Sequence, residues 1–362
     1  MSTASQTSVR ADRLAALAAE RELDAVLVTN LVDVRYLTGY TGSNGLAVVG
    51  ADGLRRFVTD FRYVTQAEEQ VHGYDRVIGE TDLLEEVAPA LPDGPVRLGF
   101  DDGHVSVKTH ARLRELLPER VELVAAGGLV ERLRLVKDAA EVERIRAAAV
   151  LADAALQTVL EDGLAGRTER EVALALEHEM QRRGAQRASF DTIVAAGGHG
   201  ALPHASPRDV EIPAGTLVVV DWGAELDGYC SDCTRTFATG ELDQRAKDVY
   251  ALVLEAQLAG LAAVGPGRSA READAAARDL IAARGHGAQF GHSLGHGVGI
   301  EIHEAPRLSR SSTATLAAGN VVTVEPGIYI PGVLGVRIED LVLVTDDGHE
   351  VLNTLPKELT VV

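Results

Sequence analysis

Basic residues are scarce in this sequence. Its 362 residues include 35 lysines and arginines against 54 aspartates and glutamates, so the formal net charge is -19 at pH 7. Nucleic acids and anionic membrane surfaces attract proteins through clustered positive charge, and a surplus of acidic residues opposes that attraction. We therefore expect neither nucleic acid nor a membrane surface as a partner.

Long apolar segments are lacking as well. No run approaches the roughly 20 residues that a membrane-spanning helix needs. The start, Met1-Ser2-Thr3-Ala4, has no positively charged segment followed by an apolar one, which is the layout of a secretory signal. We expect the protein to act in the cytoplasm.

Cysteine is limited to Cys230 and Cys233. A Cys-x-x-Cys spacing is typical of a redox pair or of half a zinc site. Residues three apart in a strand point to opposite faces, however, so the two sulfur atoms should diverge. We expect neither a disulfide nor a thiolate zinc site, and Asp232 between the cysteines is the more informative residue.

The length predicts two domains, because one hydrophobic core seldom spans this many residues. Strand-like runs alternate with helical stretches in the first part, which is typical of a small α/β domain. The strands are expected at 25–28, 46–49 and 96–100 and the helices at 11–21 and 108–117. Strand signals stop near 132–137, where Asp138 and Glu141 form a capping-box start for a long helix. We place the domains at 1–134 and 135–362, with an α/β (α+β) fold class.

The second domain contains an internal repeat. Ala214-Gly215 and Asp221-Trp222-Gly223 recur as Ala318-Gly319 and Glu325-Pro326-Gly327, at a constant offset of 104. Around each copy we expect two helices and a hairpin, with helices starting at Asp138 and Thr168 in the first half and at Asp243 and Ser269 in the second. A single duplication of this length predicts a pseudo-twofold domain closed around one central site.

Each expected hairpin carries two acids. Asp221 and Asp232 are symmetric about Leu226-Asp227, and Glu325 and Glu339 are symmetric about Gly332. Residues opposed in an antiparallel hairpin have Cβ atoms about 4.5 to 5.5 Å apart, where like charges repel. Two divalent ions would neutralise four such carboxylates.

Solvent-exposed acids are the simpler interpretation of any one pair, since aspartate and glutamate usually lie at the surface. Apolar strands precede both pairs, at 217–220 and 321–324, which indicates burial. Two buried pairs at repeat-related positions favour the metal site.

Four histidines accompany these acids. His292 and His296 lie among glycines, which indicates an extended segment rather than a helical zinc motif. His204 and His303 occupy repeat-related positions at an offset of 99. The remaining histidines are expected to be structural or exposed: His72, His104, His110, His178, His199, His286 and His349.

These motifs resemble the pita-bread metallopeptidases, within them the Xaa-Pro aminopeptidase and Xaa-Pro dipeptidase (prolidase) branch. The resemblance rests on Asp221-x-Gly, on 231–236 (SDCTRT), on 291–297 (GHSLGHG), on Glu325-Pro-Gly and on 336–340 (VRIED). The segment 34–43 resembles the creatinase-type N-terminal domain. The metal ligands that the resemblance implies are Asp221, Asp232, His296, Glu325 and Glu339.

The resemblance implies a dinuclear-metal peptidase that cleaves after an N-terminal residue followed by proline, with a metal-activated hydroxide attacking the peptide carbonyl. We take the Xaa-Pro aminopeptidase as the first interpretation and the dipeptide-restricted prolidase as its alternative. A creatinase-like amidinohydrolase, an inactive binding module and a methionine aminopeptidase are more remote. The complete ligand set argues against the first two, and the large N-terminal domain argues against the third.

Roles for further residues follow from the same resemblance. Glu325 would transfer the proton, and His204, His292 and His303 would bind substrate or stabilise the tetrahedral intermediate. Arg337 shares a strand face with Glu339 and could orient carboxylates or only balance their charge. Arg307 is a weaker candidate for holding a substrate carboxylate, and a surface role is the alternative. Manganese or cobalt is the expected metal, with zinc or iron also compatible. The family implies a homodimer.

Overall fold

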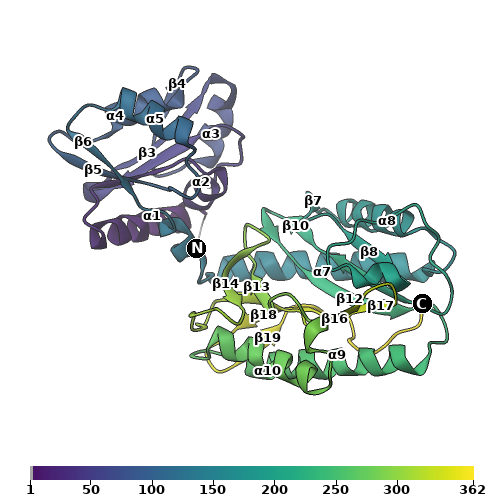
Figure 1. The fold of residues 1–362 in the computed structure, drawn as a ribbon. Helices are drawn as coiled ribbons and strands as arrows, with labels where there is room; N and C mark the ends of the chain where they lie inside the picture. Colours follow the sequence, from purple (N-terminus) through teal and green to yellow (C-terminus); the bar gives the residue numbers. More distant parts are fainter. Residues whose placement is uncertain (1–2) are drawn as a thin grey trace. The chain divides into compact units, whose positions relative to one another are not determined.

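The computed structural model describes residues 3–362, and the chain divides into two compact units between Arg134 and Leu135 (Figure 1). Met1 and Ser2, which open the segment without a signal-peptide layout, lie outside the described residues. Within the described part, no helix combines the length and apolar character required to cross a membrane.

The N-terminal unit is a mixed six-stranded sheet flanked by helices, with strand order β4-β3-β2-β1-β5-β6. The central strand β1 pairs antiparallel with β2 and parallel with β5. Its strands are β1 (Ala25–Val28), β2 (Leu46–Gly50), β3 (Arg55–Asp60), β4 (Asp75–Gly79), β5 (Val96–Phe100) and β6 (Val121–Ala125). Its helices are α1 (Thr3–Glu20), α2 (Leu31–Thr38), α3 (Val64–Gln70), α4 (Val87–Ala90), α5 (Val107–Leu116) and α6 (Leu129–Arg134). All three expected strands and both expected helices are present, and α1 begins eight residues before the expected start.

The C-terminal unit contains four long helices and thirteen short strands within the described residues. The helices are α7 (Ala139–Glu161), α8 (Glu169–Arg182), α9 (Gln244–Ala263) and α10 (Ala270–Ala283). The strands of the first half are β7 (Arg187–Ala188), β8 (Ile193–Ala196), β9 (Leu217–Trp222), β10 (Ala224–Leu226), β11 (Tyr229–Cys230) and β12 (Cys233–Ala238). Those of the second half are β13 (Gly295–Gly297), β14 (Glu304–Leu308), β15 (Val321–Val324), β16 (Gly327–Ile330), β17 (Leu334–Arg337), β18 (Asp340–Val344) and β19 (His349–Val351).

Polar side chains define where these helices begin. The side chain of Asp138 accepts hydrogen bonds from the backbone of the first turn of α7, and the side chain of Glu141 accepts one from the backbone N–H of Asp138. These bonds confirm the expected capping box. Thr168 and Glu171 do the same for α8. Asp243 caps α9, and Ser269 accepts a bond from the backbone of residue 272 at the start of α10. The two repeat halves therefore start their helices by the same local chemistry.

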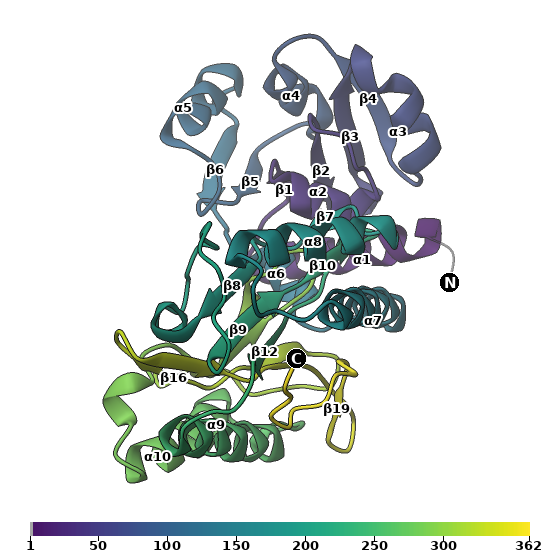
Figure 2. The same cartoon turned by 90° about the vertical axis from the view of Figure 1, so that its right-hand side faces the viewer.

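Each half has its own hydrophobic core between its helices and its strands. In the first half, α7 and α8 contribute Leu156 and Leu176, which belong to the same buried cluster as Trp222 on β9. In the second half, Val253 on α9 belongs to the same cluster as Val322 on β15. Figures 1 and 2 show α7 and α8 on one side of the strands and α9 and α10 on the other. The duplicated sequence has become a layered, pseudo-twofold unit.

The hairpin of the second half has the expected register. Val324 pairs with Asp340 and Gly327 pairs with Arg337, so Glu325 and Glu339 are opposed, as their symmetry about Gly332 predicted. Gly332 lies in the turn with φ 70, a left-handed conformation that glycine adopts without steric cost.

The hairpin of the first half differs from the prediction by one residue at its turn. Asp221 pairs with Thr234, not with Asp232, because Leu226 pairs with Tyr229 and the turn is Asp227-Gly228. Both turn residues have positive φ, 50 and 77, as the two-residue turn of a tight hairpin requires. Asp232 is two residues from the partner of Asp221 and is its diagonal neighbour. The two acids still share a face, but the prediction of direct opposition was wrong.

Candidate metal centre

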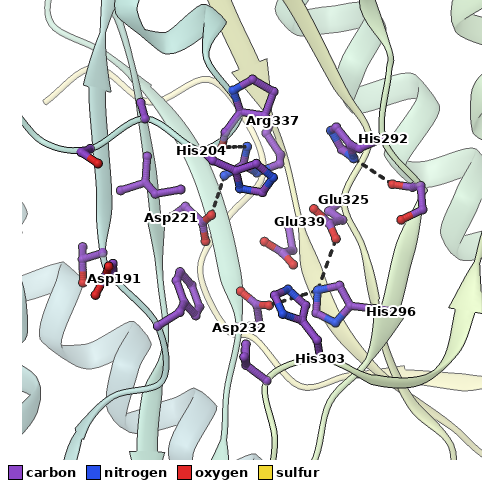
Figure 3. A pocket seen from close by; sticks show the side chains of 18 of the residues that line it. Asp191, His204, Asp221, Asp232, His292, His296, His303, Glu325, Arg337 and Glu339 are labelled. Carbon is purple, nitrogen blue, oxygen red and sulfur yellow. Dashed lines mark hydrogen bonds and ion pairs between the residues drawn. The ribbon is translucent and has the colours of Figure 1, made fainter. Parts of the chain in front are cut away.

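A cavity of about 670 Å³ opens between the two halves of the C-terminal unit. Figure 3 shows side chains from both halves pointing into it. Every site residue predicted from the sequence lines this cavity: His204, Asp221, Asp232, His292, His296, His303, Arg307, Glu325, Arg337 and Glu339.

The four acids reach the cavity from strand ends. Asp221 lies near the end of β9 and Asp232 directly before β12, while Glu325 follows β15 and Glu339 separates β17 from β18. One carboxylate oxygen from each of Asp221, Asp232 and Glu339 lies within 4.8 Å of the other two. This spacing is short enough for the three carboxylates to share cations.

His296 completes this group from β13. Its Nε2 atom lies 3.6 Å from Asp232 Oδ2 and 3.5 Å from Glu325 Oε1 (Figure 3). Burial lowers the pKa of His296 to about 4, so the imidazole is neutral at neutral pH. A neutral imidazole beside two carboxylates is a metal-ligand arrangement rather than an ion pair.

Negative charge dominates this centre, because Arg337 offsets the four carboxylates only in part. Burial raises the pKa of Asp232 and of Glu339 well above the ordinary range, and the neighbouring carboxylates raise both further. Burial also raises the pKa of Glu325 to about 7. Without added positive charge these groups resist ionisation together, because like charges in a buried site repel.

The side chains present fit two divalent cations. Asp221 Oδ1 is buried and has no hydrogen-bond partner, although buried carboxylate oxygens are normally paired. Four carboxylates carry four negative charges, which two divalent ions balance, and bridging acids are typical of two-metal sites. Oxygen donors with one imidazole suit manganese, cobalt, iron or zinc.

Arg337 forms hydrogen bonds that connect the acids of the two halves. Its guanidinium donates to Asp221 Oδ2, to Thr234 Oγ1 at 2.9 Å and to the Tyr329 hydroxyl at 2.9 Å. Thr234 Oγ1 in turn donates to Glu339 Oε2 at 2.6 Å. The arginine thus connects one acid of each half, and its role in orienting the carboxylates stays a prediction.

The other histidines lie on different sides of the acids. His292 Nε2 is 2.9 Å from the Tyr329 hydroxyl, and burial lowers the pKa of His292 to about 4. The ring of His303 lies 4.5 Å from that of His296, edge to face. Burial also lowers the pKa of His303. His204 reaches the cavity from the segment between β8 and β9 (Figure 3).

Several residues in or behind the cavity wall were not anticipated from the sequence. Tyr329 and Thr234 contact Arg337 and lie two or four residues from one of the acids on the same side of a strand, so strand alternation could have indicated both. Phe190, Asp191 and Ile193 line the cavity itself. They precede or open β8, and no local pattern in the sequence marks them.

The two cysteines are free and buried. Cys230 Sγ points to the carbonyl of Ile300, whereas Cys233 Sγ points to that of Glu339. Burial raises the pKa of both thiols, which keeps them protonated.

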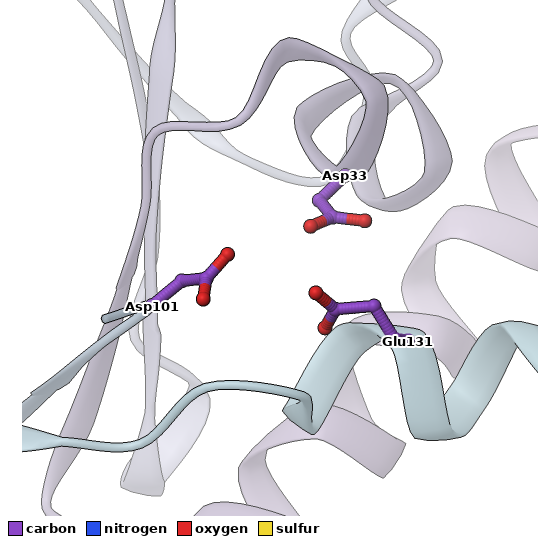
Figure 4. A group of neighbouring side chains, drawn as sticks. All are labelled: Asp33, Asp101 and Glu131. Atoms are coloured by element: carbon purple, nitrogen blue, oxygen red, sulfur yellow. The ribbon is translucent and has the colours of Figure 1, made fainter. Parts of the chain in front are cut away.

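A second group of acids occurs in the N-terminal unit, where Asp33, Asp101 and Glu131 approach one another (Figure 4). Asp33 already forms a buried ion pair with Arg134 at 2.7 Å, and Asp101 Oδ1 accepts a bond from the backbone of Gly103. These contacts account for two of the three carboxylates. We assign no metal to this group.

Comparison with known proteins defines the class to which this fold and site belong. Residues 143–346 match metallopeptidase family M24, and residues 10–136 match the creatinase/prolidase N-terminal domain. The chain belongs to the M24 metallopeptidases, with a creatinase-type α/β domain followed by a pita-bread catalytic domain. This family depends on a dinuclear metal centre.

Individual relatives narrow the class to proline peptidases. The structure of an Xaa-Pro dipeptidase from Bacillus anthracis superimposes with a TM-score of 0.94 at 42% identity, covering 98% of this chain and 100% of that one. An Xaa-Pro dipeptidase of Pyrococcus furiosus is 36% identical over 97% of this chain and 99% of that protein. An X-Pro aminopeptidase structure from Thermotoga maritima has a TM-score of 0.88 at 34% identity, covering 95% and 99%.

These relatives change the order of the two interpretations from the sequence. Both dipeptidases are more similar in sequence to this chain than the aminopeptidase is, although the difference is small. The alternative, a dipeptidase, is therefore supported at least as well as the aminopeptidase that we placed first. Either form is an Xaa-Pro metallopeptidase.

Proposed function

We propose that this chain is an Xaa-Pro dipeptidase that depends on two divalent metal ions. The observation that carries the proposal is the convergence of four carboxylates, three of them buried and that of Glu325 partly buried, and one neutral imidazole in a single cavity. The names of the most similar dipeptidases support the choice of dipeptides. The expected substrates are peptides with proline at the second position.

The metal ligands would be Asp221, Asp232, His296, Glu325 and Glu339. Two bound ions would lower the pKa of water and polarise the peptide carbonyl. Manganese or cobalt is our proposal for the ions, on the resemblance to the family.

The remaining side chains would bind the substrate and move its protons. Glu325 reaches the same part of the cavity as His296, where its carboxylate can accept the proton of the attacking water and pass it to the proline nitrogen. Partial desolvation lowers the pKa of His303, so its neutral ring can donate one hydrogen bond to a substrate oxygen and accept another. His292 already donates from Nδ1 to the carbonyl of Ser293 at 2.8 Å and accepts at Nε2 from the Tyr329 hydroxyl, so it is assigned a packing contact with the substrate. His204 lines the same cavity and is assigned the same kind of contact as His303 (Figure 3).

Arg307 supports the choice of a dipeptidase. It lines the same cavity with its side chain, and a guanidinium binds a carboxylate through two parallel hydrogen bonds. The carboxylate of a dipeptide follows the proline directly, so a cation in the lining of the same cavity would favour substrates that end there. A longer peptide places an amide at that position.

An Xaa-Pro aminopeptidase is the second candidate, favoured by the similarity to the Thermotoga maritima structure. It differs from a dipeptidase only in accepting residues after the proline. A cytoplasmic location and a homodimeric state remain predictions.

The test compares Ala-Pro with Ala-Pro-Ala as substrates of the manganese-loaded protein. We expect kcat/KM to be at least about ten times higher for the dipeptide, because one charge-assisted hydrogen bond contributes about 1.5 to 3 kcal/mol. Equal or faster cleavage of the tripeptide would make the protein an aminopeptidase. The variant Asp232→Asn should lose at least about 100-fold in activity on either substrate, since even second-shell changes at metal sites cost 10 to 100-fold.

A further inference from the structure

The segment that carries His204 is held by a residue outside the cavity. This segment, residues 196–208, leaves β8, passes through a short 3-10 helix (Gly197–Ala201) and reaches the cavity at His204. Glu169, the first residue of α8, lies against it and does not line the cavity. Its side chain is 1% exposed.

Glu169 binds both ends of this segment with one carboxylate. At the first end, Oε1 accepts hydrogen bonds from the backbone of Ala196 at 2.9 Å and from His199 Nδ1 at 3.0 Å. At the other end, Oε2 accepts from the backbone of Arg208 and from its Nε, both at 3.0 Å. Arg208 Nη2 also donates to Oε1 at 3.0 Å. The two ends of the segment 196–208 are therefore held by one buried carboxylate.

A third contact holds the middle of the segment. Arg337 donates from Nη1 to the carbonyl of Pro203 at 3.2 Å, one residue before His204. The guanidinium of Arg337 also binds Asp221. The backbone beside His204 is thus connected to the metal centre on one side and to Glu169 on the other.

Glu169 has the charge state that this arrangement needs. Burial by itself would raise its pKa, but the donors of Arg208, Ala196 and His199 outweigh burial and hold the pKa of Glu169 below its ordinary value. The N-terminus of α8 also favours a negative charge. The carboxylate is therefore ionised at neutral pH and accepts charge-assisted hydrogen bonds, which are about twice as strong as neutral ones.

Glu169 is not needed to cap the N-terminus of α8. Thr168 and Glu171 already form a complete capping box at the start of α8. The carboxylate of Glu169 points away from the helix to partners 27 to 39 residues further along the chain.

We propose that Glu169 is a positioning residue that fixes the segment 196–208, and through it the imidazole of His204, relative to the metal centre. The inference rests on the proposed function only for the role of His204, since the clamp itself is a property of the fold. Histidine placement matters for catalysis because a displacement of about 1 Å can cost about 100-fold in rate.

Amide hydrogen exchange tests the clamp without reference to activity. The variant Glu169→Gln keeps the size of the side chain but removes its charge and replaces one acceptor oxygen by a donor group. We expect at least about tenfold faster exchange in residues 197–207, since a bond to a charged group contributes about 1.5 to 3 kcal/mol. The matched control is Glu179→Gln, a carboxylate near the other end of α8 that binds Arg182 and Arg183. It should leave exchange in 197–207 unchanged, and equal exchange in both variants would overturn the proposal.

A double-mutant cycle on Ala-Pro hydrolysis then connects the clamp to His204. Glu169→Gln should lower kcat/KM by about 10 to 100-fold in the wild-type background, but by less than about threefold when His204 is already alanine. Glu179→Gln should have no effect in either background. Full additivity of the Glu169 and His204 changes would show that Glu169 acts elsewhere and would overturn the proposal.

A milder variant covers the case in which Glu169→Gln does not fold. Arg208 is 47% exposed in its side chain, and Arg208→Gln removes the two side-chain hydrogen bonds to Glu169 while leaving the backbone bond of residue 208. It should accelerate amide exchange in the segment 196–208, and it should lower kcat/KM less in the His204→Ala background than in the wild type. An absence of both effects would overturn the proposal. If the wild type fails to cleave Ala-Pro, the proposed function is wrong, while the exchange experiment still decides whether the clamp exists.

Discussion

At the scale of single residues, burial sets the charge of the groups around the cavity. His292 is the clearest case outside the metal ligands, because burial and, to a lesser extent, the nearby Arg337 lower its pKa from 6.5 to about 4. The ring is therefore neutral in the folded protein under conditions where a histidine in an unfolded chain is half protonated.

This difference predicts an acid-sensitive contribution to stability. Below pH 6.5 the unfolded chain takes up a proton at residue 292 that the folded chain does not accept until the pH nears 4, so stability falls as the pH drops through this window. The contribution amounts to about 3 kcal/mol at its largest. Urea unfolding of the metal-free protein should show a shallower loss between pH 6.5 and 4.5 in His292→Gln. The control is His72→Gln, at an exposed histidine, whose loss of stability over this pH range should equal that of the wild type. An equal loss in His292→Gln and the wild type would contradict our account of this site.

Arg307 allows a test of substrate length at one residue. Arg307→Ala should raise the KM for Ala-Pro by about 10 to 100-fold and leave that for Ala-Pro-Ala within a factor of about two, because only the dipeptide places its carboxylate near the guanidinium. Arg310→Ala is the control, since this exposed arginine does not line the cavity. Steady-state kinetics measure both, and equal losses on the two substrates would contradict carboxylate binding by Arg307.

Most individual site residues could be predicted from the sequence, because a metal site requires an unusual combination of acids and histidines. Buried acids at repeat-related positions indicated the metal centre, and all of the predicted residues line one cavity. Glu169 could not be found in this way. An acid in the first turn of a helix is common, and only the fold brings the segment 196–208 to it.

At the scale of elements, the two hairpins show what sequence symmetry can and cannot determine. The register about Gly332 was correct, whereas the other hairpin turns at Asp227-Gly228 and places Asp221 diagonally from Asp232. The prediction assumed that Asp221 and Asp232 pair directly, which centred the turn one residue too early in the chain. The backbone follows turn chemistry instead, since aspartate and glycine tolerate the positive φ that a two-residue turn requires. Gly223, which lies opposite Asp232, has no room for a side chain because Ser231 O is too close.

The correct hairpin gives a test of conformational strain. Gly332 has φ 70 and open space around the position of a side chain, so Gly332→Ala creates no collision but places alanine in the left-handed region. We expect a loss of about 1 kcal/mol, or about 2 °C in the melting temperature. Gly348→Ala is the matched control, because Gly348 has equal space and no positive φ. Calorimetry measures both melting temperatures. Equal values for the two variants would show that a side chain at residue 332 does not strain the turn.

At the scale of the whole molecule, the pseudo-twofold arrangement explains why the site could be predicted as a unit. The duplicated helices and strands bring two acids from each half to the same cavity, while only the second half adds the ligand candidate His296. The sequence revealed the repeat through constant offsets. It could not reveal which residues from outside the motifs, such as Phe190 and Asp191, would complete the walls, because these depend on how the halves pack.

The central claim is that this cavity holds two divalent ions that are required for Xaa-Pro cleavage. The most direct measurement is a titration of the chelated, metal-free protein with Mn²⁺, with bound metal counted by mass spectrometry and Ala-Pro hydrolysis followed in the same samples. The account predicts no hydrolysis without metal, two ions per chain at saturation, and activity that rises as these ions bind. Asp232→Asn should bind less metal and remain inactive. Hydrolysis that persists at full rate in the metal-free protein would contradict the account.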